Sequence, residues 1–268
     1  MRLTTLSLAA LMAGGAALAQ DYGRADRSLR DCDSDWGNDR ERFCEIRETT
    51  LQSVPAGGLS VDGRENGGVV FHGWNKNQIL VRAMVQSWAD TRTEAESLAK
   101  AVHVLTDDGR IRAEGPRSWH HESWAVSYEV FVPRRIDLQA ETENGGVSAD
   151  SVEGRLDFHA VNGGIHLWQV AGNVRGETTN GGVYAQLMGS QWSGSGLELE
   201  TTNGGVTLDI PRNYNAQLET GTVNGSLDID FPITIQGSLT RRLRTTLGTG
   251  GALIRATTTN GGVRIRQR

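Results

Sequence analysis

This 268-residue sequence has few cysteines and prolines and no excess of positive charge. Five prolines are too few for a proline-rich stalk or linker. The 27 Lys and Arg residues against 32 Asp and Glu residues give a net charge of −5. Nucleic-acid recognition needs a basic face, so this balance excludes nucleic acid as a partner. The sequence also contains no phosphate-binding loop, zinc-protease helix motif or nucleophile elbow.

Long apolar runs are scarce too, with one exception at the start. The apolar run Leu3–Leu18 follows the charged Arg2, and small residues lie at Ala17 and Ala19. This order predicts a secretory signal peptide over residues 1–19, with cleavage before Gln20. The run is too short and too rich in Ala and Gly for a good membrane span. We therefore expect an exported mature chain, periplasmic or at the cell surface, without a membrane span.

The two cysteines, Cys32 and Cys44, lie close together near the expected mature N-terminus. In an oxidising export compartment such a pair is typical of a disulfide. The alternative is half of a zinc site, which needs about four ligands. Since no histidine lies between residues 20 and 71, we predict the disulfide. The polar segment 20–58 is expected to be a loosely held arm.

The strongest feature of the sequence is a repeated tripeptide. Asn-Gly-Gly begins at Asn66, Asn144, Asn162, Asn180, Asn203 and Asn260, and Asn224-Gly-Ser is a degenerate copy. From Asn144 onward the spacings are 18, 18, 23, 21 and 36 residues. A recurrent unit of about twenty residues is typical of architectures in which neighbouring units stack.

On both sides of each Asn the residue character alternates with a period of two, as in a strand with one buried face. Each repeat is therefore predicted as strand, tight turn, strand. Asn-Gly between strands also occurs in antiparallel hairpins. Because the turn recurs at short spacing, we favour a mainly β fold with a parallel β-solenoid over residues 137–268, its Asn side chains stacked at the turns. A sandwich of antiparallel hairpins is the alternative. At least one glycine of each turn is expected to have a positive φ.

Residues 59–136 combine several element types and are expected to form a small α+β cap on the solenoid. Thr93 and Glu96 predict a capping box at the start of a helix over Thr93–Val102. Asp107-Asp108-Gly109 predicts a hairpin turn. The remaining predicted strands are Leu59–Val61, Val69–Phe71, Gln78–Trp88 and Trp124–Val132. Terminal units of repeat proteins usually need such a closing element.

The repeats and their entry segment resemble a known family. The run from Tyr128 through Pro133 into Asn144-Gly-Gly, together with Gly194–Leu208, is similar to the bacterial adhesin-like family of β-strand repeat proteins, DUF4097. The resemblance covers Leu59 to Arg268. It implies an exported β-helical protein and no reaction, because the family has no established catalytic residues.

Outward positions of a stacked repeat form rows along the molecule, and two kinds of side chain in these rows are candidates for binding. Trp168, Tyr184, Trp192 and Tyr214 are candidates for an aromatic track that binds a glycan. Stacking in sequence order would bring Asp209, Asp228 and Asp230 onto neighbouring coils, where like charges attract a cation. The Gly-Gly-x-Gly-x-Asp calcium repeat is absent, so we predict no metal and no cofactor.

These features predict a non-catalytic envelope or surface protein, an adhesin-like scaffold for an unidentified envelope partner or glycan. The alternative is a carbohydrate-active β-helix enzyme, a polysaccharide hydrolase or lyase. Such an enzyme uses paired carboxylates, for which Asp209 with Asp228 or Asp230 is the best pair. The position of these carboxylates, in a cleft or on a flat sheet, distinguishes the two.

Overall fold

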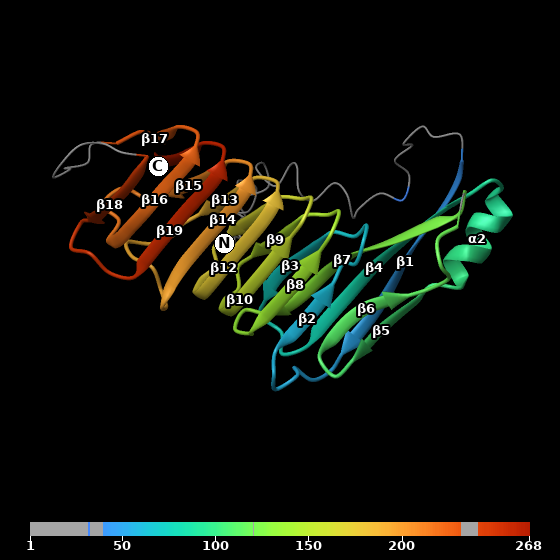
Figure 1. Cartoon of the computed structure of the whole chain (residues 1–268). Coiled ribbons are helices and arrows are strands. Elements are labelled where there is room, and N and C mark those ends of the chain that lie inside the picture. Colours follow the sequence, from blue (N-terminus) through green and yellow to red (C-terminus); the bar gives the residue numbers. More distant parts are fainter. Residues whose placement is uncertain (1–31, 33–39, 120, 232–240) are drawn as a thin grey trace, which may run out of the picture.

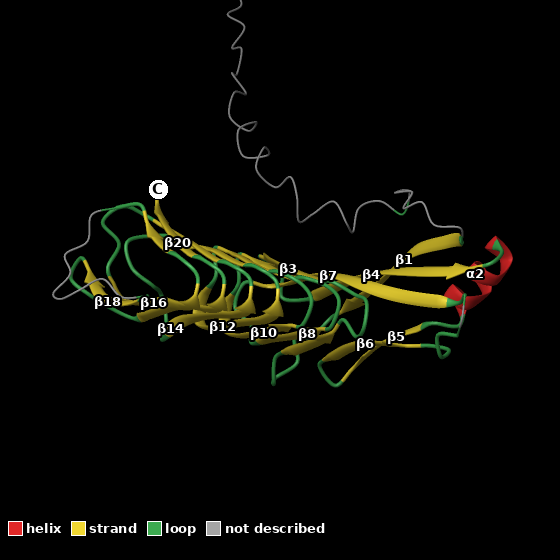
Figure 2. Cartoon of the chain, turned by 45° about the horizontal axis from the view of Figure 1, so that its top comes forward, coloured by secondary structure: helices red, strands yellow, loops and turns green. Residues whose placement is uncertain are grey.

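The computed structural model describes residues 32, 40–119, 121–231 and 241–268. These residues form a mainly β molecule of two ten-stranded sheets with one helix, α2 (Arg92–Lys100), at one end (Figures 1 and 2). The first sheet has the order β1 (Glu41–Leu51), β4 (Ile79–Ala89), β7 (Ser123–Pro133), β3 (Val69–Trp74), β9 (Val147–Asp150), β11 (Ile165–Trp168), β13 (Val183–Gln186), β15 (Val206–Ile210), β20 (Val263–Gln267), β17 (Leu227–Ile229). The second has the order β18 (Arg242–Leu247), β16 (Ala216–Asn224), β19 (Leu253–Asn260), β14 (Gly196–Asn203), β12 (Ala171–Asn180), β10 (Glu153–Ala160), β8 (Leu138–Thr142), β2 (Leu59–Asp62), β6 (Arg110–Glu114), β5 (His103–Asp107).

Strands of neighbouring repeats pair in parallel, which confirms the predicted parallel strands. The strand before each Asn lies in the second sheet and the strand after it lies in the first. Equivalent positions face one another, as where Arg175 on β12 lies between Asp157 on β10 and Glu198 on β14. Antiparallel pairs occur towards the ends, between β1, β4 and β7, between β5 and β6, and between β16 and β18.

The repeats do not stack in sequence order, so that expectation is wrong. The last repeat is inserted, with β19 between β14 and β16 and β20 between β15 and β17. Charge complementarity favours the inserted order. Sequence order would place Glu198 opposite Glu219, whereas the inserted Arg255 lies opposite both, and unlike charges on adjacent strands stabilise their pairing. The outer edge of β16 is occupied by β18.

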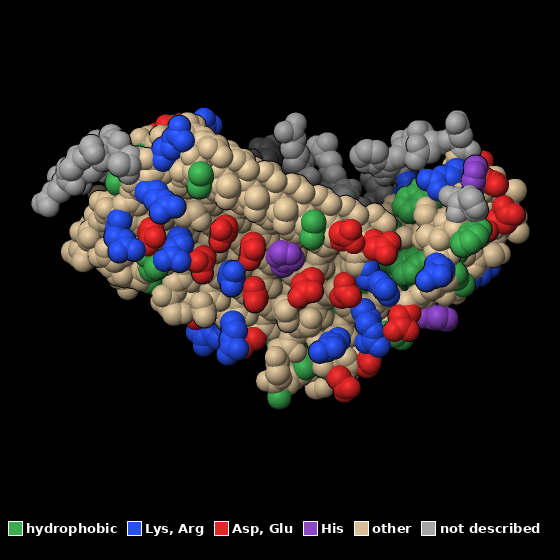
Figure 3. Space-filling model, viewed as in Figure 1, with side chains coloured by type: hydrophobic (Ala, Val, Ile, Leu, Met, Phe, Trp, Pro, Cys, Tyr) green, Lys and Arg blue, Asp and Glu red, His purple; other side chains and the backbone are tan. Residues whose placement is uncertain are grey.

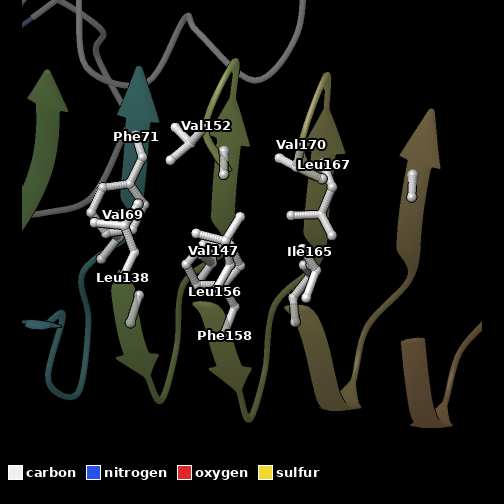
Figure 4. Close-up of a cluster of buried hydrophobic side chains, with 14 of the residues drawn as sticks. Val69, Phe71, Leu138, Val147, Val152, Leu156, Phe158, Ile165, Leu167 and Val170 are labelled. Atoms are coloured by element: carbon white, nitrogen blue, oxygen red, sulfur yellow. The ribbon is translucent and has the colours of Figure 1, made fainter. Parts of the chain in front are cut away.

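The core lies between the two sheets and is filled by every second residue of the strands (Figure 4). Leu156 and Phe158 on β10 and Ile165 and Leu167 on β11 all lie in this core (Figure 4), and all four are buried. Phe158 also stacks on Phe71 of β3, with ring centroids 5.7 Å apart. Burial of a side chain of this size contributes about 1.5–3 kcal/mol. The alternating pattern in the sequence therefore forms one continuous core.

The glycines of the turns are required for close packing. Gly181, Gly182, Gly204 and Gly205 have no positive φ, so the predicted conformational reason is wrong for them. A Cβ atom on Gly204 would lie 1.9 Å from the carbonyl oxygen of Gly181, whereas one on Gly182 would lie 3.6 Å from its nearest atom. The first glycine of each turn thus has no room for a side chain. The degenerate copy keeps this glycine and changes the second to Ser226.

Two rows of hydrogen bonds run along the turns. The seven Asn amides form a ladder, each Nδ2 donating to the preceding Oδ1, in the order Asn66, Asn144, Asn162, Asn180, Asn203, Asn260, Asn224. Five of its six contacts measure 2.8–2.9 Å. Buried threonines two residues before an Asn donate to the first-glycine carbonyl of the adjacent repeat, as Thr201 does to Gly181. Both rows fix the register between repeats.

The N-terminal part differs from the expected loose arm. β1 pairs with β4 along its whole length, and Cys44 within β1 forms the predicted disulfide with Cys32, with Cα atoms 5.4 Å apart. The pairing uses main-chain groups at the edge of β4, so the sparse apolar residues of β1 gave little signal. The proposed signal peptide lies outside the described residues.

The helix and hairpin were predicted in the right places, with one error of register. The capping box of α2 is formed by Thr91 and Glu94. The predicted cap residue Glu96 instead forms an ion pair with Lys100. Asp108 and Gly109 have the positive φ values of a tight hairpin turn between β5 and β6.

Replacement of the first glycine of a turn should destabilise the fold more than replacement of the second. We expect Gly204→Ala to lower the free energy of unfolding by about 1–3 kcal/mol, because an added methyl group overlaps a main-chain oxygen. Gly182→Ala has room for its methyl group and should change that free energy by no more than about 1 kcal/mol. Denaturant unfolding of both variants checks this, and equal losses would contradict the close-packing argument.

The inserted position of the last repeat can be tested by cross-linking. Adjacent strands lie about 4.8 Å apart, within disulfide reach, whereas Cα atoms more than about 7 Å apart cannot be bridged. Glu198→Cys with Arg255→Cys should form a disulfide. Glu198→Cys with Glu219→Cys should not, since β19 lies between them. Peptide mass mapping reads both results, and the reverse outcome would establish sequence-order stacking.

Candidate functional site

Three aromatic rings form a cluster on the outward face of the first sheet. His166 and Trp168 lie on β11, and Tyr184 lies opposite His166 on β13. The ring centroids are 5.6 Å apart for His166 and Trp168, 6.2 Å for His166 and Tyr184, and 5.9 Å for Trp168 and Tyr184. Burial lowers the pKa of His166, so this ring is uncharged at neutral pH. The predicted residues Trp168 and Tyr184 therefore lie together, joined by a histidine that sequence reasoning missed.

Asp209 adjoins this cluster as a structural anchor. Its side chain is 0% exposed. One oxygen accepts a hydrogen bond of 2.8 Å from the Tyr184 hydroxyl, and the other lies 2.6 Å from Arg266 Nε on the adjacent strand β20. Arg268 also forms an ion pair with it. Burial and the bond to Asp209 raise the pKa of Tyr184 to about 12. Asp209 has no surface with which to reach a ligand.

Asp228 and Asp230 do not join Asp209, so the predicted acidic cluster does not form. β20 lies between β15 and β17, and its arginines separate the carboxylates. Arg264 Nε lies 3.1 Å from Asp228, while Asp230 accepts a hydrogen bond from the main chain of Gln267. In the described part of the chain no three acidic, histidine or cysteine side chains are grouped as metal ligands.

Two cavities of the described residues lie away from these carboxylates. One cavity of about 410 Å³ lies between β6 and β7, and another of about 380 Å³ lies over β10, β12 and β14. Neither is lined by Asp209, Asp228 or Asp230. A glycosidase holds its two carboxyl groups around a substrate, whereas these side chains occupy one face of a sheet. The arrangement gives no support to the predicted catalytic pair.

Trp192 does not belong to the aromatic cluster. It is 6% exposed, lies between β13 and β14, and donates from Nε1 to the carbonyl of Gly172 at 2.9 Å. Its ring is packed against the core between the sheets. Because an indole with its N–H bonded inside the protein anchors a loop, we exclude Trp192 from the binding face.

A second polar and aromatic group continues the same outward face toward α2. Glu129 on β7, almost fully buried, lies between His72 of β3 and Arg82 of β4. Hydrogen bonds from His72 and Arg82 lower the pKa of Glu129. The His72 ring stacks on Phe131, with centroids 5.0 Å apart. Sequence reasoning missed this group because the pairing of β3 with β7 joins segments more than fifty residues apart.

The outer face of the second sheet is different, because charged side chains cover it (Figure 3). Arg255 lies between two carboxylates, 2.9 Å from Glu198 and 3.5 Å from Glu219. Arg175 forms its ion pair with Glu177 of its own strand. Exposed pairs of this kind contribute about 0–1 kcal/mol each. This face is a solvated charge ladder, and the aromatic face of the first sheet is the candidate site.

Comparison with known proteins gives only remote structural likenesses, since no family model and no curated protein matches the chain. A candidate cell adhesion protein of Clostridium sporogenes is 11% identical, with 84% of this chain and 100% of that chain covered and a TM-score of 0.43. A candidate adhesin of Bacteroides fragilis is 10% identical over 84% and 97%, with a TM-score of 0.33. A candidate lipid-binding protein of Parabacteroides distasonis is 10% identical over 84% and 96%, with a TM-score of 0.29. Likenesses at these scores establish no common function.

The described residues contain no helix long and apolar enough to cross a membrane. The membership in DUF4097 that the repeats suggest stays a prediction.

Removal of the Asp209 charge should lower the free energy of unfolding clearly, and removal of the Asp228 charge should lower it much less. Asp209→Asn leaves Arg266 and Arg268 without their buried partner. Breaking a fully buried pair costs about 3–5 kcal/mol. Because both arginines are partly exposed, we expect a loss of about 1–3 kcal/mol in unfolding free energy. Asp228→Asn disrupts an exposed pair and should cost no more than about 1 kcal/mol. Equal melting temperatures for the two variants would contradict the anchoring role of Asp209.

Proposed function

We propose that this chain is an exported, non-catalytic scaffold of the cell envelope or surface, adhesin-like, which binds a glycan or envelope partner on the outward face of its first sheet. The observation that carries the proposal is the cluster of His166, Trp168 and Tyr184, displayed on a sheet face and not in a cleft. Aromatic rings held this way offer flat apolar surfaces with polar edges, which suit carbohydrate rings and protein surfaces alike.

The fold we propose for this scaffold is a parallel β-solenoid over residues 137–268, closed at one end by the α+β region 59–136. The parallel pairing of successive repeats and the Asn ladder support it. Export is supported by the disulfide between Cys32 and Cys44, since such bonds persist in oxidising compartments. The apolar run over residues 1–19 is the proposed signal peptide.

The absence of catalysis is part of the proposal. Active sites hold reactive groups in concave, water-limiting pockets. Asp209 is fully buried among three donors, and Asp228 is paired with Arg264 on an open face. Neither carboxylate has the access and enclosure that glycoside cleavage needs.

Binding and turnover can be measured together on the exported protein. Incubation with a panel of polysaccharides and peptidoglycan should give binding, read by co-sedimentation, without release of reducing ends or unsaturated products. Trp168→Ala should weaken binding by about tenfold, since an aromatic contact of this kind is worth about 1 kcal/mol or more. Trp119→Ala serves as the matched control, because Trp119 is an exposed tryptophan outside this face.

Two outcomes would contradict the proposal. Turnover that disappears in Asp228→Asn would identify an enzyme and would move the function to the carboxylate pair. Binding that Trp168→Ala and Trp119→Ala reduce equally would show that the aromatic cluster is not the binding face.

A further inference from the structure

The cavity of about 410 Å³ lies away from the aromatic cluster and is lined by three separate segments. Its walls come from the turn after β2, from the end of β6 with its following loop, and from the first half of β7. β6 belongs to the second sheet and β7 to the first, and Figure 2 shows them one above the other near α2. Its volume is within the range of small-molecule sites, about 300–1,000 Å³.

Tyr128 of β7 has a buried hydroxyl without a hydrogen-bond partner in the described part of the chain. Tyr128 is one of the residues that line the cavity, and its side chain is 0% exposed. Burial raises the pKa of Tyr128, so the phenol keeps its proton and can both donate and accept. Buried polar groups are nearly always bonded, so an orphaned hydroxyl on a residue that lines a cavity indicates a missing partner.

Two arginines provide positive charge at the cavity. Arg64 donates from Nη1 to the carbonyl of Ala113 at 2.9 Å, which holds its guanidinium at the wall. Arg117 also lines the cavity. Among the described residues Glu65 is the one acidic residue of the lining, and the nearby Asp62 carboxylate accepts a hydrogen bond from the main-chain N–H of Arg64. Guanidinium groups bind carboxylates in bidentate geometry.

Trp124 supplies an apolar wall on the same side of β7 as Tyr128. Its indole Nε1 donates to the carbonyl of Pro116 at 2.7 Å, which fixes the ring against the loop. Asn66 and Ser118 add polar groups that can bind hydroxyls. The lining therefore combines cations, hydroxyl-binding groups and one aromatic surface.

We propose that this cavity binds a small anionic, hydroxylated molecule of the sugar-acid class. Its carboxylate would lie at Arg64 and Arg117, and one of its hydroxyls would bond to the Tyr128 hydroxyl, beside the ring of Trp124. This site is separate from the aromatic face and does not rest on the function proposed for it.

The test is calorimetric titration of the full chain with sodium glucuronate and sodium galacturonate, with glucose as the neutral control. At least one uronate should bind, and glucose should bind at least about tenfold more weakly, since it lacks the charge for the arginines. Arg117→Gln should remove most of this difference. Failure of both uronates to bind, or equal binding of glucose, would overturn the proposal.

A matched pair of tyrosine variants separates the site from general effects on the core. Tyr128→Phe removes one hydroxyl that has no protein partner, so the melting temperature should stay the same or rise, while uronate affinity falls about tenfold. Tyr214→Phe is the control, because Tyr214 is equally buried, its hydroxyl is also without a partner, and it lies outside the cavity. Equal affinities of the two variants would show that Tyr128 makes no contact with the ligand.

Discussion

The close approach of main chains at the turns is the constraint on which the rest of this structure depends. A Cβ atom on the first glycine of a turn would lie about 2 Å from a carbonyl oxygen of the adjacent repeat, as at Gly163 with 1.9 Å and at Gly181 with 2.1 Å. Only glycine permits this spacing. Once it is fixed, the Asn amides come within hydrogen-bond distance and the outward side chains fall into rows.

The rows then determine which repeat lies next to which. Every repeat offers the same main chain and the same Asn, so these groups do not distinguish one neighbour from another. Charge does, because Arg255, Arg264 and Arg266 all belong to the last repeat, and the carboxylates they contact belong to the two repeats on either side. We infer that electrostatic pairing selects the inserted order, while hydrogen bonding and burial supply most of the stability.

The sequence was informative where the determining contacts are local or periodic. Alternation predicted β4 and β7, Asp107-Asp108-Gly109 predicted the hairpin between β5 and β6, and the Asn-Gly-Gly spacing predicted stacked parallel strands. It failed where contacts join distant segments. The position of the last repeat depends on pairings across 36 and 57 residues, and Trp192 could not be told from an outward aromatic without knowing the path of its loop.

The candidate site was predictable only in part for the same reason. Trp168 and Tyr184 lie at equivalent positions of adjacent repeats, so their proximity follows from the repeat itself. The three aspartates were expected together because sequence order was assumed, and one inserted strand separates them. The cavity beside Tyr128 had no sequence signal, because its lining comes from three segments whose only common feature is their position in the fold.

Main-chain and inward groups hold this fold together, which leaves outward side chains available for function. Since turn glycines and inward residues hold the register, outward positions that form no ion pair between repeats are free to vary, and a rigid sheet presents whatever they carry. A binding group on such a surface is preorganised, so little conformational entropy is lost when a partner is bound. Asp209 goes further than these ion-paired residues, because it is an outward-row residue whose side chain is fully buried. Its bonds to Tyr184 and Arg266 tie the aromatic cluster to the inserted repeat, so the geometry of the aromatic face depends on the order in which the repeats stack.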